Sequence, residues 1–272
     1  AYVYAGLLDG ECAQMVFTDP PYNVPIDGHV CGLGEVKHRE FEMAAGEMSE
    51  AEFTDFLSTV FANLAEHSAD GALHFICMDW RHMREVLSAG HAAYSEMKNL
   101  CVWAKTNGGM GTLYRSQHEL VFVFKAGTGR HINNVELGKH GRHRTNVWTY
   151  PGISSFGKDR DAELALHPTV KPVQLVADAM LDCSKRGGIV LDAFAGSGTT
   201  LVAAENMGRI GYGIELDPAY CDIIVRRMAT SFDLDAIHTA SGKTFAEIKR
   251  EQYPDTGDEE DPAPDPIEVE VV

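Results

Sequence analysis

The sequence lacks a long apolar run. No stretch of about eighteen apolar residues, the length needed to cross a membrane, occurs in the chain. A charged start followed by an apolar run, the pattern of a secretory signal, is also missing. These two absences predict that the protein has neither a membrane span nor a signal peptide, and we expect it to be cytoplasmic.

Paired metal-binding residues are missing as well. The six cysteines form no C-x-x-C pair, which argues against a zinc cluster and against a disulfide framework. His140 and His143 lie three residues apart, but no cysteine or acid accompanies them at ligand spacing. The sequence therefore predicts no bound metal.

Basic residues are scarce overall, and their distribution is uneven. The net charge is −17, but residues 251–272 hold nine acids and no base, so that residues 1–250 carry only −8. This Pro- and acid-rich tail is predicted to be disordered. Residues 125–160 hold seven bases against two acids, a local balance of +5. A polyanionic partner would be met at this basic segment.

A glycine-rich bend dominates the second half of the chain. Residues 188–200 form an apolar run that ends at Asp192, followed by Gly196 and Gly198 and then by small helix-forming residues. A second apolar run ends at Glu215. An apolar strand, a glycine bend, a helix and a second strand ending in an acid are typical of a βαβ unit that binds an adenosine-containing ligand.

The bend lacks the residues that bind phosphate. Thr199 stands where a phosphate-binding loop carries lysine, and Leu201 stands where a dinucleotide fingerprint carries its third glycine. Glu215 lies at the distance from the bend at which an acid binds ribose hydroxyls. An adenosine that carries an amino acid in place of phosphates fits these features, and S-adenosylmethionine is the common one.

Apolar runs alternate with helical patterns along the rest of the chain, which predicts an α/β fold with a mainly parallel sheet. A capping box at Ser49 and Glu52 begins one helix, and Pro172 occupies the first position of another. The expected strands include residues 14–18, 72–77, 100–103 and 118–124. The expected helices include residues 53–64, 80–89, 172–184 and 218–230. Residues 23–48 and 126–166 lack a clear period and are predicted to be a long loop and an inserted lobe.

Three motifs identify a family when they are taken in order. Asp19-Pro20-Pro21-Tyr22, residues 167–172 (HPTVKP) and residues 194–200 (FAGSGTT) together resemble the β-group amino-methyltransferases of DNA, which modify adenine N6 or cytosine N4. Residues 103–107 and 118–125 add further similarity. The resemblance implies a Rossmann-like methyltransferase fold with a catalytic half at 1–125, a target-recognition insertion at 126–166, a cofactor half at 167–250 and an acidic tail at 251–272.

The resemblance assigns the catalytic motif a specific chemistry. The exocyclic amino nitrogen of a base is a poor nucleophile, because its lone pair is delocalised into the ring. Asp19 and a backbone carbonyl of Pro20 or Pro21 would each accept one N–H, which turns the lone pair toward the methyl group. Tyr22 would stack on a base that has been flipped out of the duplex.

The same resemblance assigns the cofactor and DNA contacts. Thr169 and Lys171 would meet the methionine carboxylate, Asp192 the ammonium and Glu215 the ribose. Arg142 and Arg144 are the first candidates for DNA contacts in the basic segment. The remaining cofactor contacts implied by the family are Phe194, Ala195, Gly196, Ser197, Gly198, Thr199 and Thr200.

We therefore expect methylation of adenine N6 in double-stranded DNA with S-adenosylmethionine as cofactor. The resemblance also implies a homodimer. Cytosine N4, RNA or a protein amide are alternative substrates, and a silent DNA-binding subunit is the alternative outside catalysis. Relatives carry a Gly-Asp element upstream of the catalytic motif, whereas here residues 2–8 have a helical pattern, which suggests a longer natural chain.

Overall fold

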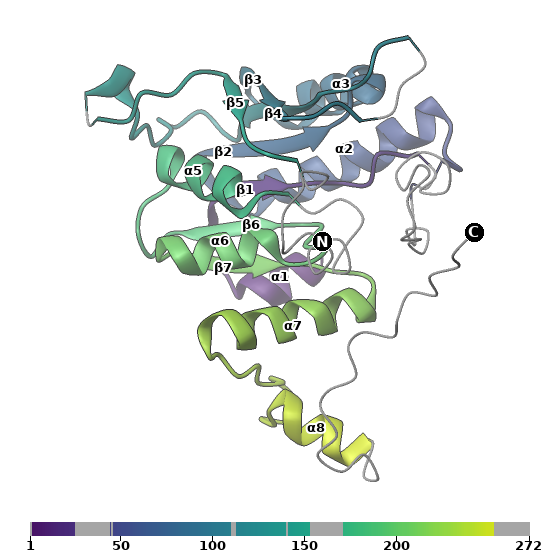
Figure 1. Ribbon diagram of the computed structural model, residues 1–272, viewed down its shortest axis with the longest axis vertical. Helices are drawn as coiled ribbons and strands as arrows, with labels where there is room; N and C mark the ends of the chain where they lie inside the picture. The colour runs from purple at the N-terminus through teal and green to yellow at the C-terminus, as the bar shows by residue number, and fades with distance from the viewer. Residues whose placement is uncertain are drawn as a thin grey trace.

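The computed structural model describes residues 2–24, 44, 46–109, 113–139, 141–152 and 171–252. These residues form a seven-stranded sheet with helices on both faces (Figure 1). The strands are β1 Ala13–Thr18, β2 Ser68–Met78, β3 Glu96–Ala104, β4 His118–Lys125, β5 Val147–Thr149, β6 Ile189–Asp192 and β7 Ile210–Gly213. In the part of the chain described, no helix has the length and apolarity to cross a membrane.

The strand order is β5-β3-β4-β2-β1-β6-β7. β4 runs antiparallel to β2 and β3, and all other neighbours are parallel. The described residues between β3 and β4, 105–109 and 113–117, contain no crossover helix, which allows the antiparallel pairing. The predicted α/β fold with a mainly parallel sheet is confirmed. The carboxyl ends of five strands therefore lie on the same side of the sheet, at the same end of the strands: β1, β2, β3, β6 and β7.

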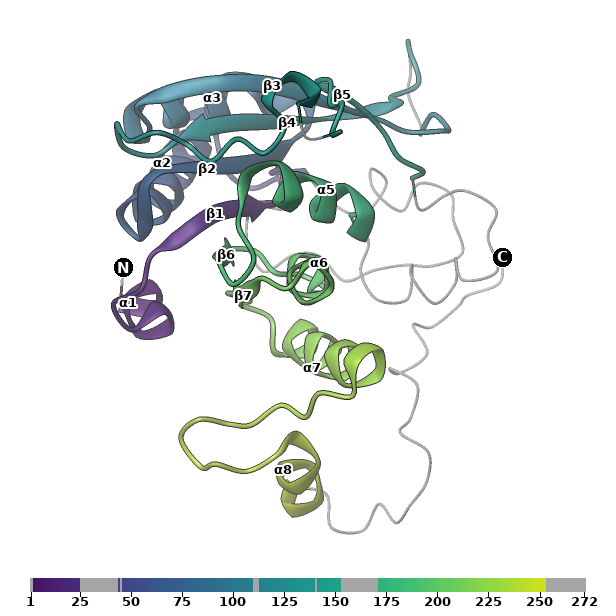
Figure 2. The ribbon, with the colours of Figure 1, turned by 90° about the vertical axis from the view of Figure 1, so that its left-hand side faces the viewer.

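The helices form two layers (Figure 2). α1, α2 and α3 lie on one face of the sheet, and α5 and α6 lie on the other, with α7 beyond them at the β7 edge (Figures 1 and 2). The helices are α1 Tyr2–Leu8, α2 Glu50–Glu66, α3 Met83–Ala93, α5 Val173–Cys183, α6 Thr199–Met207, α7 Pro218–Phe232 and α8 Phe245–Gln252, with 3-10 turns η1 Trp80–His82 and η2 Glu136–Gly138.

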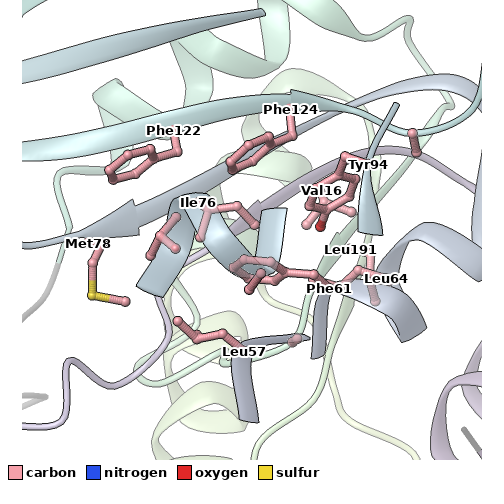
Figure 3. Close-up of a cluster of buried hydrophobic side chains, with 14 of the residues drawn as sticks. Val16, Leu57, Phe61, Leu64, Ile76, Met78, Tyr94, Phe122, Phe124 and Leu191 are labelled. Carbon is pink, nitrogen blue, oxygen red and sulfur yellow. The ribbon is translucent and has the colours of Figure 1, made fainter. Parts of the chain in front are cut away.

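The central strands are buried on both faces. In β2, Ile76 and Met78 point toward α2 and α3, whereas Phe75 and Cys77 point toward α5, because successive side chains of a strand face opposite ways. Figure 3 shows the first of these cores, in which Phe61 of α2 lies below the strands. Strands buried on two sides are continuous apolar runs in the sequence, which made them recognisable.

Most of the predicted elements are present. The capping box between Ser49 and Glu52 begins α2 as expected. Several boundaries differ; β2 and β3, for example, each begin four residues before the expected position, at Ser68 and Glu96. The helix expected over residues 80–89 is divided into η1 and α3, because the Asp79 carboxylate accepts the backbone N–H groups of Arg81 and His82 and caps a separate turn. Pro172 is the N-cap of α5, one position before the helix, and has an extended ψ of 126°.

Three predicted irregular segments are only partly described. Residues 25–43 and 45 of the expected loop and residues 140 and 153–166 of the expected insertion lie outside the described residues. Within the insertion, β5 pairs in parallel with β3, so part of this segment extends the main sheet. Disorder was predicted from residue 251, but Glu251 and Gln252 belong to α8; residues 253–272 lie outside the described part.

A buried histidine should make the fold sensitive to acid. His74 of β2 is fully buried, its Nδ1 contacts the Tyr94 hydroxyl at 3.0 Å, and its Nε2 has no hydrogen-bond partner among the described residues. Burial lowers the pKa of His74 from 6.5 to about 3. The unfolded chain therefore binds a proton that the folded chain rejects, and stability is lost as pH falls below the unfolded pKa.

We expect His74 to contribute a loss of about 1.4 kcal/mol in unfolding free energy between about pH 7.5 and about pH 5.5. Urea unfolding at the two pH values should show this loss in the wild type and a correspondingly smaller one in His74→Phe. His91→Phe, an exposed site on α3, is the control and should keep the wild-type difference. Equal pH sensitivity of wild type and His74→Phe would contradict the interpretation.

Candidate cofactor and catalytic site

The ends of two adjacent strands bring the motifs together. β1 pairs in parallel with β6 through Met15 and Val190, so the segments that follow both strands emerge side by side. The Thr18 hydroxyl donates to Asp192 Oδ1 at 2.8 Å. The same hydroxyl accepts the backbone N–H of Ala193 at 3.2 Å. Asp19 and the glycine bend, which are far apart in sequence, therefore both lie at the carboxyl ends of adjacent strands.

The bend depends on two glycines with left-handed backbone. Gly196 has φ 51° and Gly198 has φ 79°, and residues that carry a side chain rarely adopt either backbone conformation. A Cβ on Gly198 would also lie 3.0 Å from the Ile224 side chain of α7. Gly198 is the N-cap of α6, so the bend leads directly into the N-terminus of this helix, where the first backbone N–H groups have no intrahelical partner.

Asp192 stabilises the bend from inside. Its carboxylate accepts the Thr18 hydroxyl, the Phe194 backbone N–H at 3.0 Å and the Thr200 hydroxyl at 2.6 Å. Burial raises the pKa of Asp192 to about 7 against the lowering effect of these hydrogen bonds. The three contacts join β1, the bend and α6. The contact of Asp192 with the cofactor ammonium remains a prediction.

Glu215 closes the other side of the bend. Its Oε2 accepts the Gly196 N–H at 2.7 Å, and its Oε1 accepts the N–H groups of Leu216 and Asp217 at 2.9 Å each. Beside it lies a mainly apolar cavity of about 360 Å³. The lining residues are Val3, Leu7, Leu201, Gly213, Ile214, Glu215, Cys221, Ile224 and Val225. An apolar cavity next to a carboxylate and a glycine bend fits an adenosine, whose base is apolar on its faces and whose ribose offers hydroxyls.

Asp19 lies in a network of part-buried charges. Its Oδ1 accepts the Tyr22 hydroxyl at 2.7 Å, and its Oδ2 pairs with the Lys171 ammonium. Lys171 also pairs with Glu119 Oε2 at 3.1 Å, and Glu119 Oε1 pairs with Lys105. The four charges balance. The catalytic acid expected from the sequence is therefore held by a lysine and a tyrosine from the same site.

The pKa values of the two acids are displaced in opposite directions. Burial raises the pKa of Asp19, the charge of Lys171 lowers it, and the charge of Glu119 raises it again, so that it remains above its ordinary value. Burial also raises the pKa of Glu119, but the charges of Lys171 and Lys105 outweigh this effect and lower it to about 2. Glu119 therefore favours its charged form more strongly than Asp19 does.

Glu119 and Lys105 were missed as site residues. Both lie in stretches whose similarity to the family was noted, at the start of β4 and just after β3, but no role was attached to them. No sequence signal placed them in the site, because it is the observed register of Ala104 with His118 that brings Lys105 and Glu119 to the end of the strands where Asp19 lies.

The other predicted site residues have mixed outcomes. Thr169 lies outside the described residues, and Pro20 and Pro21 follow β1 as expected. Arg142 Nη2 lies 2.7 Å from Asp182 Oδ1, and Arg144 Nε lies 2.9 Å from Asp182 Oδ2. These ion pairs attach the basic segment to α5. The DNA contacts of both arginines remain predictions.

The fold and the site together define a class: a Rossmann-like methyltransferase, in which a glycine bend after one central strand adjoins an acid after the next. The chain belongs to the DNA methylase family, whose model matches residues 13–226. The resemblance to the N6 and N4 amino-methyltransferases of DNA is thereby confirmed, and S-adenosylmethionine is the cofactor that this membership implies.

Two proteins with similar sequences are named type II methyltransferases. Type II methyltransferase M2.DpnII of Streptococcus pneumoniae is 27% identical over 236 residues, which cover 80% of this chain and 83% of that protein. Type II methyltransferase M.ScaI of Streptomyces caespitosus is 38% identical over 88 residues, which cover 32% of this chain and only 29% of that protein. The similarity to M.ScaI is therefore local.

Solved structures agree in fold. The M1.HpyAVI–SAM complex superimposes with a TM-score of 0.57 at 18% identity, covering 84% of this chain and 94% of that one. The cytosine-N4-specific PvuII DNA methyltransferase gives a TM-score of 0.61 at 15% identity, covering 81% and 82%. At these identities the similarity extends to the architecture alone.

Proposed function

We propose that the protein transfers a methyl group from S-adenosylmethionine to the N6 amino group of adenine in duplex DNA. The observation that supports this proposal is the pairing of β1 with β6, which brings the start of the Asp19 motif next to Asp192, shortly before the glycine bend. One small molecule held in the bend can then present its reactive end to a base bound at Asp19. The preference for adenine rests on the aspartate that opens the catalytic motif.

The residues of this chain supply binding and orientation. S-adenosylmethionine brings an electrophilic sulfonium methyl. Asp19 accepts one N–H of the target amino group, and a carbonyl of Pro20 or Pro21 accepts the other, so the nitrogen lone pair points at the methyl group. As the N–C bond forms, the bond between the methyl group and the sulfonium breaks and S-adenosylhomocysteine is the leaving group. The part-buried carboxylate of Asp19, as a hydrogen-bond acceptor, would offset the positive charge that develops on the nitrogen, and the extra proton then passes to solvent.

Tyr22 and the basic segment complete the proposed DNA contacts. The hydroxyl of Tyr22 is held by Asp19 and Glu119, and its ring, which has the Lys171 ammonium 5.5 Å from its centre, would stack on a base that has left the duplex. Residues 125–160 carry the excess positive charge on an otherwise acidic chain, which suits them to the DNA backbone. A homodimer remains a prediction from the resemblance.

The test is to identify the modified nucleoside. Duplex DNA of mixed sequence is incubated with the protein and labelled S-adenosylmethionine, digested to nucleosides and analysed by mass spectrometry. We expect N6-methyladenine. N4-methylcytosine would overturn the choice of base within the same family. A calorimetric titration that shows no binding of S-adenosylmethionine would favour the silent DNA-binding subunit.

A further inference from the structure

The Lys171 ammonium lies between two carboxylates. It pairs with Asp19 on one side and with Glu119 at 3.1 Å on the other, and only 6% of its side chain is exposed. The Tyr22 hydroxyl also lies within hydrogen-bond distance of both carboxylates, 2.7 Å from Asp19 and 3.2 Å from Glu119. Both groups that contact Asp19 therefore contact Glu119 as well.

These contacts occupy both oxygens of Asp19. Oδ1 accepts from Tyr22 and Oδ2 pairs with Lys171, so an incoming amino group competes with both of them for the lone pairs of Asp19. A buried ammonium that loses its only counter-ion is strongly destabilised. Lys171 can leave Asp19 at low cost only if a second carboxylate keeps its charge paired.

Glu119 is positioned to act as that second carboxylate. Its other oxygen pairs with Lys105, whose ammonium lies 4.6 Å from the centre of the Trp103 ring, so its position is fixed from β3 as well as from β4. Because one lysine balances it on each side, Glu119 stays charged whether Lys171 turns toward it or toward Asp19.

We propose that Glu119 is a positioning residue for methyl transfer: it retains Lys171 and Tyr22 while Asp19 exchanges them for the amino group of the target base. This inference rests on the proposed function and adds a residue to it. No bond is made or broken at Glu119. Its contribution is to keep the neighbouring charges paired during the exchange.

The test is Glu119→Gln, which keeps the shape and one acceptor oxygen but removes the charge. Lys171 then has Asp19 as its only anionic partner in the network, and kcat/KM for DNA should fall about tenfold to a hundredfold, the range for a lost hydrogen bond between charged groups. The acid limb of the kcat/KM profile should also move to lower pH, because the charge of Glu119 raises the pKa of Asp19. A purely structural role would lower the rate without moving the limb.

Glu96→Gln is the matched control. Glu96 also bridges two lysines, Lys98 at 2.9 Å and Lys125 at 3.3 Å, but it lies at the start of β3, at the opposite end of the strand from the site. Both the rate and the acid limb should be unchanged in this variant. A loss equal to that of Glu119→Gln would overturn the proposal.

A carboxyl 13C NMR titration of Asp19 without DNA gives a readout that does not depend on activity. Its midpoint should be lower in Glu119→Gln than in the wild type, and an unchanged midpoint overturns the proposal. An unchanged kcat/KM in an active enzyme overturns it too. Absence of DNA methylation by the wild type would instead refute the proposed function and with it the role of Glu119 in methyl transfer, whereas a lowered NMR midpoint would still show that Glu119 and Asp19 interact.

Discussion

Replacing Asp19 with alanine should lower kcat for DNA methylation by about a thousandfold, the order found when a single group that stabilises transition-state charge is removed. The remaining carbonyl acceptor cannot compensate, because it carries no charge to offset the developing positive nitrogen. S-adenosylmethionine binding should persist, since the described contacts of the bend involve Thr18, Asp192 and Glu215 but not Asp19. Transfer of labelled methyl groups to DNA and calorimetric titration of the cofactor measure the two quantities separately.

Asp79→Asn is a suitable control for this substitution. Asp79 directly follows β2 at the same sheet edge and caps η1, a task that asparagine also performs. The variant should retain wild-type activity. If Asp19→Ala methylated DNA at a rate close to that of the wild type, the catalytic assignment of the Asp19 motif would be wrong.

Replacing Gly198 with valine should weaken S-adenosylmethionine binding by about tenfold to a hundredfold. A β-branched residue at φ 79° costs about 1–3 kcal/mol, and the new side chain would also approach Ile224. Relief of both strains moves the bend and tilts the start of α6. Calorimetry should show the loss of affinity, and circular dichroism should show a folded protein.

Gly242→Val separates this effect from general strain. Gly242 has a similar φ of 67°, but a Cβ there meets nothing within 4 Å, and it lies in the connection between α7 and α8. We expect wild-type cofactor affinity in this variant. If both substitutions weakened binding equally, the glycine bend would not be the cofactor site.

The local signals of the sequence predicted the cofactor unit well. A strand ending at Asp192, a bend at Gly196 and Gly198 and a second strand ending before Glu215 are all present, because each depends on neighbouring residues. The approach of Asp19 to the bend could be expected as well, since ligands of parallel sheets gather at the carboxyl ends of the strands.

The features that depend on contacts between residues far apart in the sequence could not be predicted. The direction of β4 could not be read from the sequence, because the connection formed by residues 105–117 fits more than one strand arrangement. Without that direction, nothing placed Glu119 beside Lys171. In the same way, Arg142 and Arg144 were expected to be free for DNA, but the carboxylate that binds them, Asp182, belongs to a helix about 40 residues later in the chain.

The position of β1 has a consequence for biosynthesis. This strand is made early, yet its partner β6 follows much later, with Thr18 and Asp192 separated by 174 residues. While the ribosome makes the intervening chain, one edge of β1 stays open, and open apolar edges invite aggregation. Correct maturation should therefore be slow and sensitive to the supply of chaperones, which predicts higher soluble yield at reduced expression temperature or with chaperone co-expression.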